Sequence, residues 1–219
     1  MKLFKKIFVI LIILITILIY YKFENKKINY VAINITEKEN YSDYFVKNIK
    51  KLGKFNKILE TKMSSEELLE DIDKNIEILE NVTIQNNVTI QNIINSASII
   101  TIMLNPNEIY NTKTYNELEI IINNINQILS KIRKISNAKI YFLGFYNIYD
   151  NKEIDNKIIY TNSKIENLCK KYKIDYIDLY NVLKNRKYLF YINDNNLPNK
   201  DANIMISNEI LKKYNQKSI

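Results

Sequence analysis

Five short runs of apolar, β-branched and aromatic residues alternate along the chain with longer stretches whose apolar positions recur at helical spacing. The runs predict strands at residues 28–34, 55–60, 97–104, 138–146 and 174–180. The longer stretches predict helices at 41–52, 64–79, 115–135, 156–172 and 202–214. Each crossover between parallel strands needs a helix to return the chain. We therefore expect an α/β fold, a flavodoxin-like three-layer α/β/α sandwich with a five-stranded parallel sheet.

Two of the predicted strands, at residues 99–104 and 140–143, are apolar almost throughout. Such strands are typical of a sheet that is buried on both faces. In open parallel sheets, ligands bind beyond the carboxyl ends of the strands. The residues that follow each strand are therefore the candidates for binding or chemistry.

The first two dozen residues have a different pattern. An apolar run extends from Ile7 to Tyr21 with Thr16 as its only polar residue; three lysines precede it and Lys22 closes it. No small residues suited to signal cleavage follow the run, so we expect an uncleaved signal anchor, a single-pass transmembrane helix in the cell membrane. This divides the chain into an anchor with a short linker (1–27) and one domain (28–219) on the extracytoplasmic side.

The net charge of +8 is of the sign found in proteins that bind nucleic acid. The lysines are, however, interleaved with Glu and Asp and form no basic run of the kind that follows a phosphate backbone. We therefore expect no nucleic-acid partner. Cys169 is the only cysteine, which excludes an internal disulfide and a cysteine-rich metal site. We expect no metal and no other cofactor.

The chain contains no histidine. A hydroxyl nucleophile has a pKa far above neutrality and needs an adjacent base to take its proton. In hydrolases with Ser-His-Asp or Cys-His centres, that base is an imidazole. The composition therefore excludes both kinds of centre for this chain acting alone.

Five segments, in order, carry a resemblance to a known family. Tyr30 to Ile33 is similar to a strand that leads into Gly-Asp-Ser, and residues 100–108 are similar to a strand that ends in Gly-x-Asn-Asp. Residues 188–211, which contain Asp-Asn-Asn-Leu-Pro-Asn before a helix, are similar to an Asp-x-x-His-Pro-Asn block. Residues 64–69 and 140–147 resemble the helix after the second family block and the fourth strand.

Together these segments resemble the SGNH/GDSL hydrolase superfamily, in its membrane-anchored bacterial lipase/acylhydrolase-like branch. The resemblance implies an esterase-like scaffold and assigns positions to its catalytic set. Thr36 stands where the family has its nucleophilic serine, Lys62 near the oxyanion glycine, and Leu197 in place of the histidine. Asn107 matches the oxyanion asparagine and Asp194 the aspartate. The general base is thus missing from the block that should supply it.

The resemblance leads to three hypotheses. The first is a degenerate, non-catalytic SGNH-like domain at the cell envelope, which binds a carbohydrate, an acyl ligand or a protein partner. The second is an active esterase, acylhydrolase or acyltransferase in which a desolvated Lys62 serves as base for Thr36. The third is an interaction protein whose former cleft is filled. Thr36, Asn107 and Asp194 also have a purely structural interpretation as cap or turn residues.

Overall fold

The computed structural model describes residue 8 and residues 11–16, 27–34, 39–59, 64–73, 90–191 and 197–216. Its centre is a five-stranded sheet in the order β2-β1-β3-β4-β5, in which every pair is parallel. The strands are β1 (Ile28–Asn34), β2 (Leu52–Leu59), β3 (Ile99–Met103), β4 (Lys139–Leu143) and β5 (Asp175–Ile177). The five predicted strands and the α/β class are confirmed.

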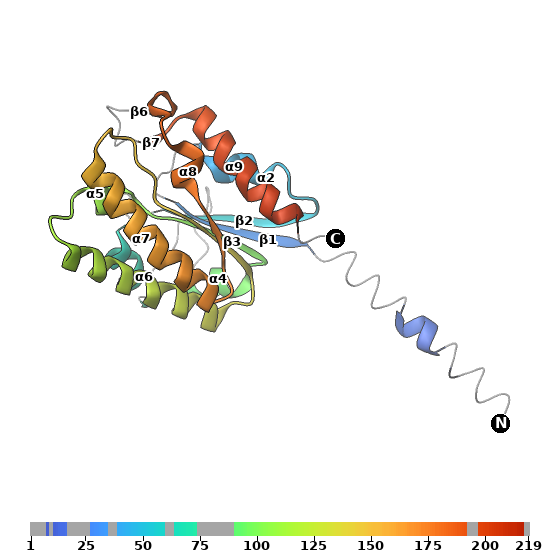
Figure 1. Cartoon of the computed structure of the whole chain (residues 1–219). Helices are drawn as coiled ribbons and strands as arrows, with labels where there is room; N and C mark the ends of the chain where they lie inside the picture. Colours follow the sequence, from blue (N-terminus) through green and yellow to red (C-terminus); the bar gives the residue numbers. More distant parts are fainter. Residues whose placement is uncertain are drawn as a thin grey trace.

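Helices cover both faces of the sheet (Figure 1). One face packs against α2 (Tyr41–Val46), α8 (Leu179–Leu183) and α9 (Lys200–Asn215). The other packs against α3 (Ser65–Asp73), α4 (Ile90–Ser96), α6 (Tyr115–Ile135) and α7 (Lys152–Lys171). Short elements complete the described chain: α5 (Asn107–Tyr110), η1 (Lys187–Leu189) and the antiparallel pair β6 (Phe190–Tyr191) and β7 (Leu197–Pro198).

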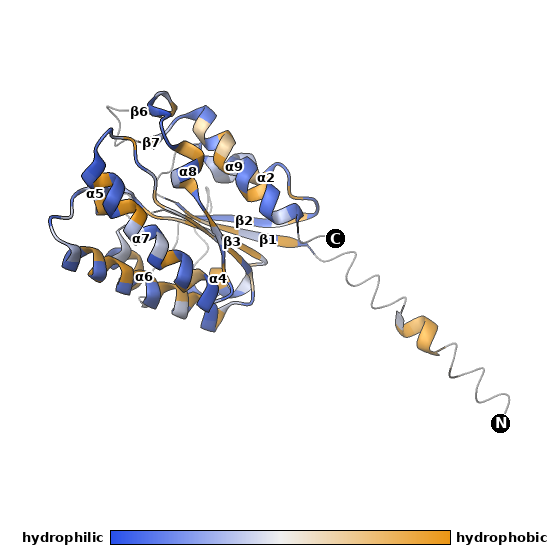
Figure 2. Cartoon of the chain, in the orientation of Figure 1, coloured by the Kyte–Doolittle hydropathy of each residue, from blue (hydrophilic) through white to orange (hydrophobic). Residues whose placement is uncertain are grey.

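Alternation along the strands supplies a separate core to each face, because successive strand side chains point to opposite sides. In β1, Val31 and Ile33 join the core under α6 and α7, whereas Tyr30 and Ala32 join the core under α2 and α9. The central strands β1 and β3 are mostly apolar in Figure 2, whereas β2 also carries the hydrophilic residues Lys54, Asn56 and Lys57. β2 is an edge strand, and its polar residues suit a position with one open side.

Three predicted elements end three or more residues earlier than their apolar pattern indicates. The helix expected at 41–52 ends at Val46, and Lys51 adopts a left-handed conformation, with a φ of 59°, that turns the chain into β2. β4 ends at Leu143, and the Phe145 N–H donates to the Asn162 side chain on α7 at 2.9 Å. β5 ends at Ile177 because Asp178 caps α8.

Within the predicted anchor, the structure describes Phe8 and residues 11–16, which are helical and exposed. No helix among the described residues is long and apolar enough to cross a membrane. The rest of the apolar run lies outside the described residues, so the anchor stays a prediction.

Candidate functional site

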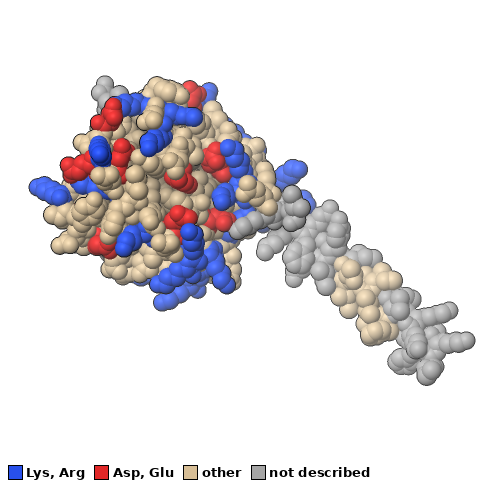
Figure 3. Space-filling view, in the orientation of Figure 1, with Lys and Arg blue, Asp and Glu red and all other residues tan. Residues whose placement is uncertain are grey.

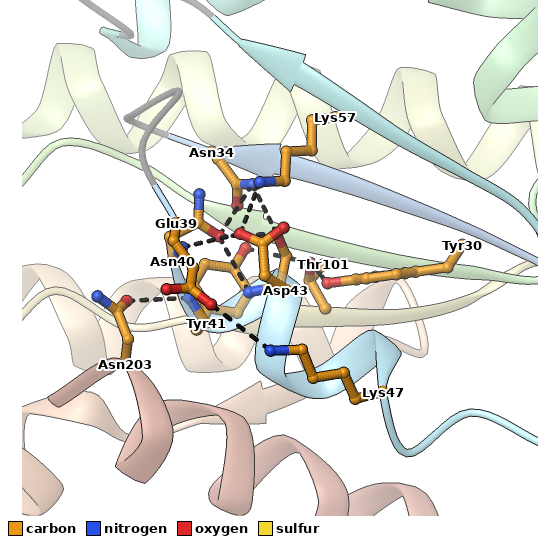
Figure 4. Close-up of polar contacts among 11 residues, drawn as sticks. Tyr30, Asn34, Glu39, Asn40, Tyr41, Asp43, Lys47, Lys57, Thr101 and Asn203 are labelled. Atoms are coloured by element: carbon orange, nitrogen blue, oxygen red, sulfur yellow. Dashed lines mark hydrogen bonds and ion pairs between the residues drawn. The ribbon is translucent and has the colours of Figure 1, made fainter. Parts of the chain in front are cut away.

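The carboxyl end of β1 carries a buried asparagine. Asn34 is 1% exposed, and its amide nitrogen donates to the Asn40 side-chain oxygen at 3.4 Å and to the Ser42 hydroxyl at 3.1 Å (Figure 4). Its Oδ1 has no hydrogen-bond partner within the part of the chain that is described. The Asn34 side chain therefore fills the space beside the start of α2.

α2 begins with a capping box that holds this polar cluster in place. The Asn40 side chain accepts from the Ser42 N–H at 3.0 Å, and the Asn40 N–H donates to the Asp43 carboxylate at 2.8 Å. Such reciprocal bonds satisfy two N–H groups that the helix itself cannot pair. Asp43 also pairs with Lys57 of β2 at 2.6 Å, and both side chains are largely shielded from solvent. The carboxylate is thus committed to a structural ion pair.

Beneath the cluster, three hydroxyl groups share a buried network. The Thr101 hydroxyl of β3 lies 2.8 Å from the Tyr30 hydroxyl and 3.1 Å from the Tyr41 hydroxyl. Burial raises the pKa of both tyrosines well above the ordinary value, so they stay neutral. The network fastens α2 to the middle of the sheet.

Asn203 of α9 joins the last predicted block to the first. It is 5% exposed, and its Oδ1 accepts from the Tyr41 N–H at 2.9 Å. Its amide nitrogen donates to the carbonyls of Pro198 at 2.9 Å and Asn199 at 3.0 Å. Residues 197–203 therefore lie beside the start of α2, at the same edge of the sheet as Asn34.

Asn107 is the first residue of α5, just beyond the end of β3, and is half-buried. Its N–H donates to the Asn105 side chain at 3.0 Å, as in a local turn. The neighbouring Glu108 accepts from the Ser65 N–H at 3.0 Å and from the Ser65 hydroxyl at 2.6 Å. Burial raises the pKa of Glu108 despite these bonds. Glu108 thus holds the N-terminus of α3 against the end of β3.

The structure places only part of the predicted catalytic set. Thr36, Lys62 and Asp194 lie outside the described residues. Leu197 lies in β7, half-buried and paired with Tyr191 of β6. Asn107 and Leu197 both lie among the described residues, but no described contact joins their side chains. Asn203 was not among the predicted site residues, since its helical pattern gives no sign of a buried bridging role.

A cavity of about 330 Å³ opens at the carboxyl ends of β4 and β5. Residues 147–150 line it from the loop between β4 and α7, and Asp155 from the first turn of α7. Tyr180 lines it from α8, and residues 184–188 from the segment before β6. Asp155 accepts from the Tyr180 hydroxyl and from the Asn147 amide, each at 3.0 Å. The wall of the cavity is thereby built from hydrogen-bonded side chains.

The cavity lining combines cations with tyrosines. Lys184 lies over the Tyr180 ring, 5.1 Å from its centroid, and Lys187 lies 3.9 Å from the exposed Asp150. The remaining aromatic and cationic lining residues are Tyr149, Tyr188 and Arg186. Among the described lining residues, Ile148 is the only aliphatic one. This composition favours a polar ligand with negative charge over an acyl chain. In the sequence, the cluster of polar residues after the fifth predicted strand was the signal that could have indicated this cavity.

The fold is shared with several hydrolases of known structure. A lipase from a goat rumen metagenome matches with a TM-score of 0.68 and 17% identity, over 85% of this chain and 97% of that chain. A lipolytic G-D-S-L family protein from Veillonella parvula matches with a TM-score of 0.62 and 12% identity, over 87% and 98%. An acetylxylan esterase from Geobacillus stearothermophilus matches with a TM-score of 0.59 and 10% identity, over 86% and 93%.

No protein-family model and no curated protein sequence matches the chain. At these identities the structural likeness bears on the fold. The chain has the fold of the SGNH/GDSL lipolytic proteins, as its segment order predicts. The strand order 2-1-3-4-5 is also that of the flavodoxin-like doubly wound sheet.

Proposed function

We propose that this chain is a membrane-anchored SGNH-like protein that has lost the hydrolytic activity of the scaffold and binds a ligand at the cell envelope. The observation that carries the proposal is the missing base. The chain has no histidine, and Leu197 stands in the block where the resemblance requires one. Without an imidazole, an aspartate at position 194 has nothing to orient.

Four described carboxylates near the carboxyl ends of the strands are engaged in other contacts and do not replace that base. Asp43 is paired with Lys57, and Glu108 accepts from Ser65. Asp155 accepts from Tyr180, and Asp178 accepts from the Asn181 N–H at the start of α8. Each of these four carboxylates holds a helix or a side chain of the cavity wall in place. This supports a binding protein rather than a hydrolase.

The end of β1 supports the same conclusion. The resemblance places Asn34 at the glycine of Gly-Asp-Ser, two residues before Thr36. A glycine leaves room for close approach to the backbone. The buried Asn34 side chain, tied to Asn40 and Ser42, takes up that room at the end of β1.

The loss of activity is tested with the full chain in detergent micelles, a short p-nitrophenyl ester and a fluorophosphonate probe. We expect equal, background-level turnover for the chain and for Thr36→Ala, and no labelling of either. A scaffold without its triad still retains about 10³ to 10⁴ fold over water, so the comparison between variants is the criterion. Turnover or labelling that disappears in both Thr36→Ala and Lys62→Ala would overturn the proposal in favour of the Thr36/Lys62 esterase.

The cavity beside β4 and β5 favours a carbohydrate with a negative charge over the acyl and protein alternatives. Tyrosine rings offer apolar faces to sugar rings, and the lysines and arginine offer donors to a carboxylate or phosphate. We expect glucuronate and glucose 6-phosphate to raise the melting temperature of the full chain more than glucose does. A ligand at 100 times its Kd stabilises a folded protein by about 2.7 kcal/mol.

The matched variants separate this cavity from the surface in general. Lys184→Gln with Lys187→Gln removes two cations that line the cavity, whereas Lys113→Gln with Lys152→Gln removes two exposed cations that do not line it. We expect the ligand-induced rise to be lost in the first pair and kept in the second. An equal rise in both pairs would contradict binding in the cavity.

The anchor is the third part of the proposal. The run from Ile7 to Tyr21 supports it, and the single polar residue in that run, Thr16, donates its hydroxyl to the Ile12 carbonyl at 2.8 Å. A polar group satisfied within its own helix suits an apolar surrounding. We expect the full chain to stay with membranes after a carbonate wash, and a chain lacking residues 1–26 to be released. Release of both forms would refute the anchor.

A further inference from the structure

The parallel sheet gathers at one edge many lysines that are scattered along the sequence. In a parallel α/β fold, each helix ends where the next strand begins, so the C-terminal turns of the helices and the starts of the strands share one edge. We call this the amino edge. Hydrogen bonds join its segments: the Ile28 N–H donates to the Lys51 carbonyl at 3.0 Å, and the Lys139 N–H donates to the Ser98 carbonyl at 2.9 Å. Arg133 binds the carbonyls of Tyr172 and Lys173, both at 3.0 Å.

Exposed lysines gather along the amino edge. The described ones are Lys27, Lys50, Lys51, Lys54, Lys134, Lys170, Lys171, Lys173, Lys212 and Lys213. Carboxylates lie at this edge too. Glu166 and Glu209 are paired within their own helices, with Lys170 and Lys212. Glu70 and Asp71 lie in the last turn of α3, and Asp175 begins β5. The exposed lysines outnumber these carboxylates. Figure 3 shows the cluster of positive side chains over the C-terminal ends of α6 and α7.

At the carboxyl edge of the sheet, acidic residues occupy the first turns of the helices. The first turns of α3, α6, α7 and α9 carry Glu66, Glu67, Glu117, Glu153, Asp155 and Asp201. Helix dipoles favour such a division, since they stabilise acids at N-termini and bases at C-termini. They do not account for Lys27, Lys50, Lys54 and Lys173, which lie outside the last turn of any helix.

The amino edge is also the edge from which the predicted anchor departs. β1 begins there at Ile28, and six residues separate it from Tyr21, the end of the apolar run. Six residues of chain span at most about 20 Å. Cations on this edge therefore stay near the bilayer surface, where the attraction to anionic headgroups falls off over about one Debye length.

We propose that the lysine-rich amino edge docks the domain against the anionic lipid surface of the membrane that holds its anchor. Docking fixes the orientation of the domain. The carboxyl edge, with the cavity beside β4 and β5, then faces away from the bilayer. The inference rests on the proposed anchor and adds to it a defined contact surface.

The test uses the full chain in nanodiscs with nitroxide-labelled headgroups, made either of phosphatidylcholine alone or with phosphatidylglycerol. A fluorophore is attached at Asn137→Cys, in the exposed loop between α6 and β4, and for comparison at Asn116→Cys, in the first turn of α6. The native Cys169 is buried, and burial raises its pKa to about 12, so it competes poorly for the label. We expect several-fold stronger quenching at position 137 in anionic discs than in neutral discs, and little at position 116.

Two sets of variants with the same change of net charge distinguish a docking edge from bulk charge. The edge set replaces four lysines by glutamine, at Lys50, Lys54, Lys134 and Lys213, and the control set replaces Lys113, Lys152, Lys164 and Lys200. We expect the edge set alone to abolish the lipid-dependent quenching. Salt should weaken it as well, because the Debye length shrinks from about 10 Å at 0.1 M to about 3 Å at 1 M.

The possible failures are distinguishable. A chain that does not enter nanodiscs of either composition refutes the anchor. A chain that enters both, with quenching at position 137 that is independent of lipid charge, overturns the docking proposal and leaves the anchor standing. An equal loss of quenching in both variant sets overturns it too, because the effect would then come from net charge and not from the amino edge.

Discussion

At the end of β1, Asn34 buries a side-chain amide whose nitrogen bonds Asn40 and Ser42. Burying an amide is costly unless it is hydrogen-bonded. The polar residues at the start of α2 satisfy the nitrogen of this amide, whereas its Oδ1 has no partner among the described residues. This strand end is therefore part of the framework of the domain.

Glu108 gives a prediction on pH. Burial raises its pKa above the ordinary value, so the folded chain holds this proton at pH values where the unfolded chain has released it. The free energy of unfolding therefore falls as the pH rises from the ordinary pKa toward the raised one. Glu108→Gln has no proton to lose, so we expect its urea-denaturation free energy to lack this fall. Glu70→Gln, at an exposed position on α3, is the control and should keep the dependence of the parent.

Gly144 and Tyr176 give a prediction on packing. A Cβ at position 144 would lie 2.2 Å from the Tyr176 hydroxyl oxygen and 2.7 Å from the ring carbon that bears it. Overpacking of this kind costs about 1–3 kcal/mol, so Gly144→Ala should lower the free energy of unfolding by that amount. The Tyr176 hydroxyl is buried without a partner in the described structure, so Tyr176→Phe should be neutral or stabilising. The double variant should recover part of the loss, whereas strictly additive effects would contradict the clash.

At the scale of elements, the apolar periodicity predicted a helix or strand best where the repeat extended over many residues. The helix predicted at 115–135 is α6, with both ends as predicted, because seven buried residues repeat on one face and Thr114 caps its start. The strand predicted at 28–34 is β1. The short elements were missed, since four or five residues of α5 or α8 and two of β6 carry no period to read.

Candidate site residues were harder to predict than elements for a physical reason. Pattern shows which face of a helix is apolar, but it does not show which polar residue will be buried among neighbours that are distant in sequence. Asn203 bonds Tyr41 across 162 positions, and Glu108 bonds Ser65 across 43. Neither partner can be read from local spacing. Thr36, Lys62 and Asp194 lie outside the described residues, so their roles remain predictions from the resemblance.

Asn203 provides the prediction that belongs to the elements, because it connects α9, the turn before it and α2. Asn203→Ala leaves the Tyr41 N–H and the Pro198 carbonyl without their partner, and each buried group left unpaired costs about 1–3 kcal/mol. We expect chemical denaturation to show a loss of about 2–4 kcal/mol in total. Asn208→Ala, at an exposed position of the same helix, should change stability little. Equal effects of the two variants would show that the bridge contributes nothing.

At the scale of the whole molecule, the sheet direction organises both charge and binding. Ten exposed lysines lie at the amino edge, whereas the acidic first turns and the cavity, with Lys184 and Lys187 in its lining, lie at the carboxyl edge. An interleaved sequence of lysines and acids did not predict this division, because it arises only when all strands run in the same direction. The absence of a basic run in the sequence therefore argued against a continuous binding site for a nucleic-acid backbone. It did not exclude a basic surface on the folded domain.

The two cores give the last prediction. Leu129 of α6 and Ile206 of α9 are fully buried on opposite faces of the sheet. Their cores share the five strands, since alternate residues of each strand enter each core. Loss of one core should therefore unfold the other. Leu129→Ala and Ile206→Ala should each cost about 2–5 kcal/mol and lower the melting temperature.

The readout must report on each face separately. Four large buried tyrosines, Tyr30, Tyr41, Tyr141 and Tyr146, all belong to the core under α2 and α9, so near-ultraviolet circular dichroism reports chiefly on that side. Far-ultraviolet circular dichroism is weighted toward the long helices α6 and α7 on the other side. If the sheet couples the cores, Leu129→Ala shifts both signals to the same lower midpoint, and so does Ile206→Ala. A near-ultraviolet midpoint that stays at the parent value in Leu129→Ala would mean that the two layers unfold independently, because coincident transitions are the mark of a single cooperative unit.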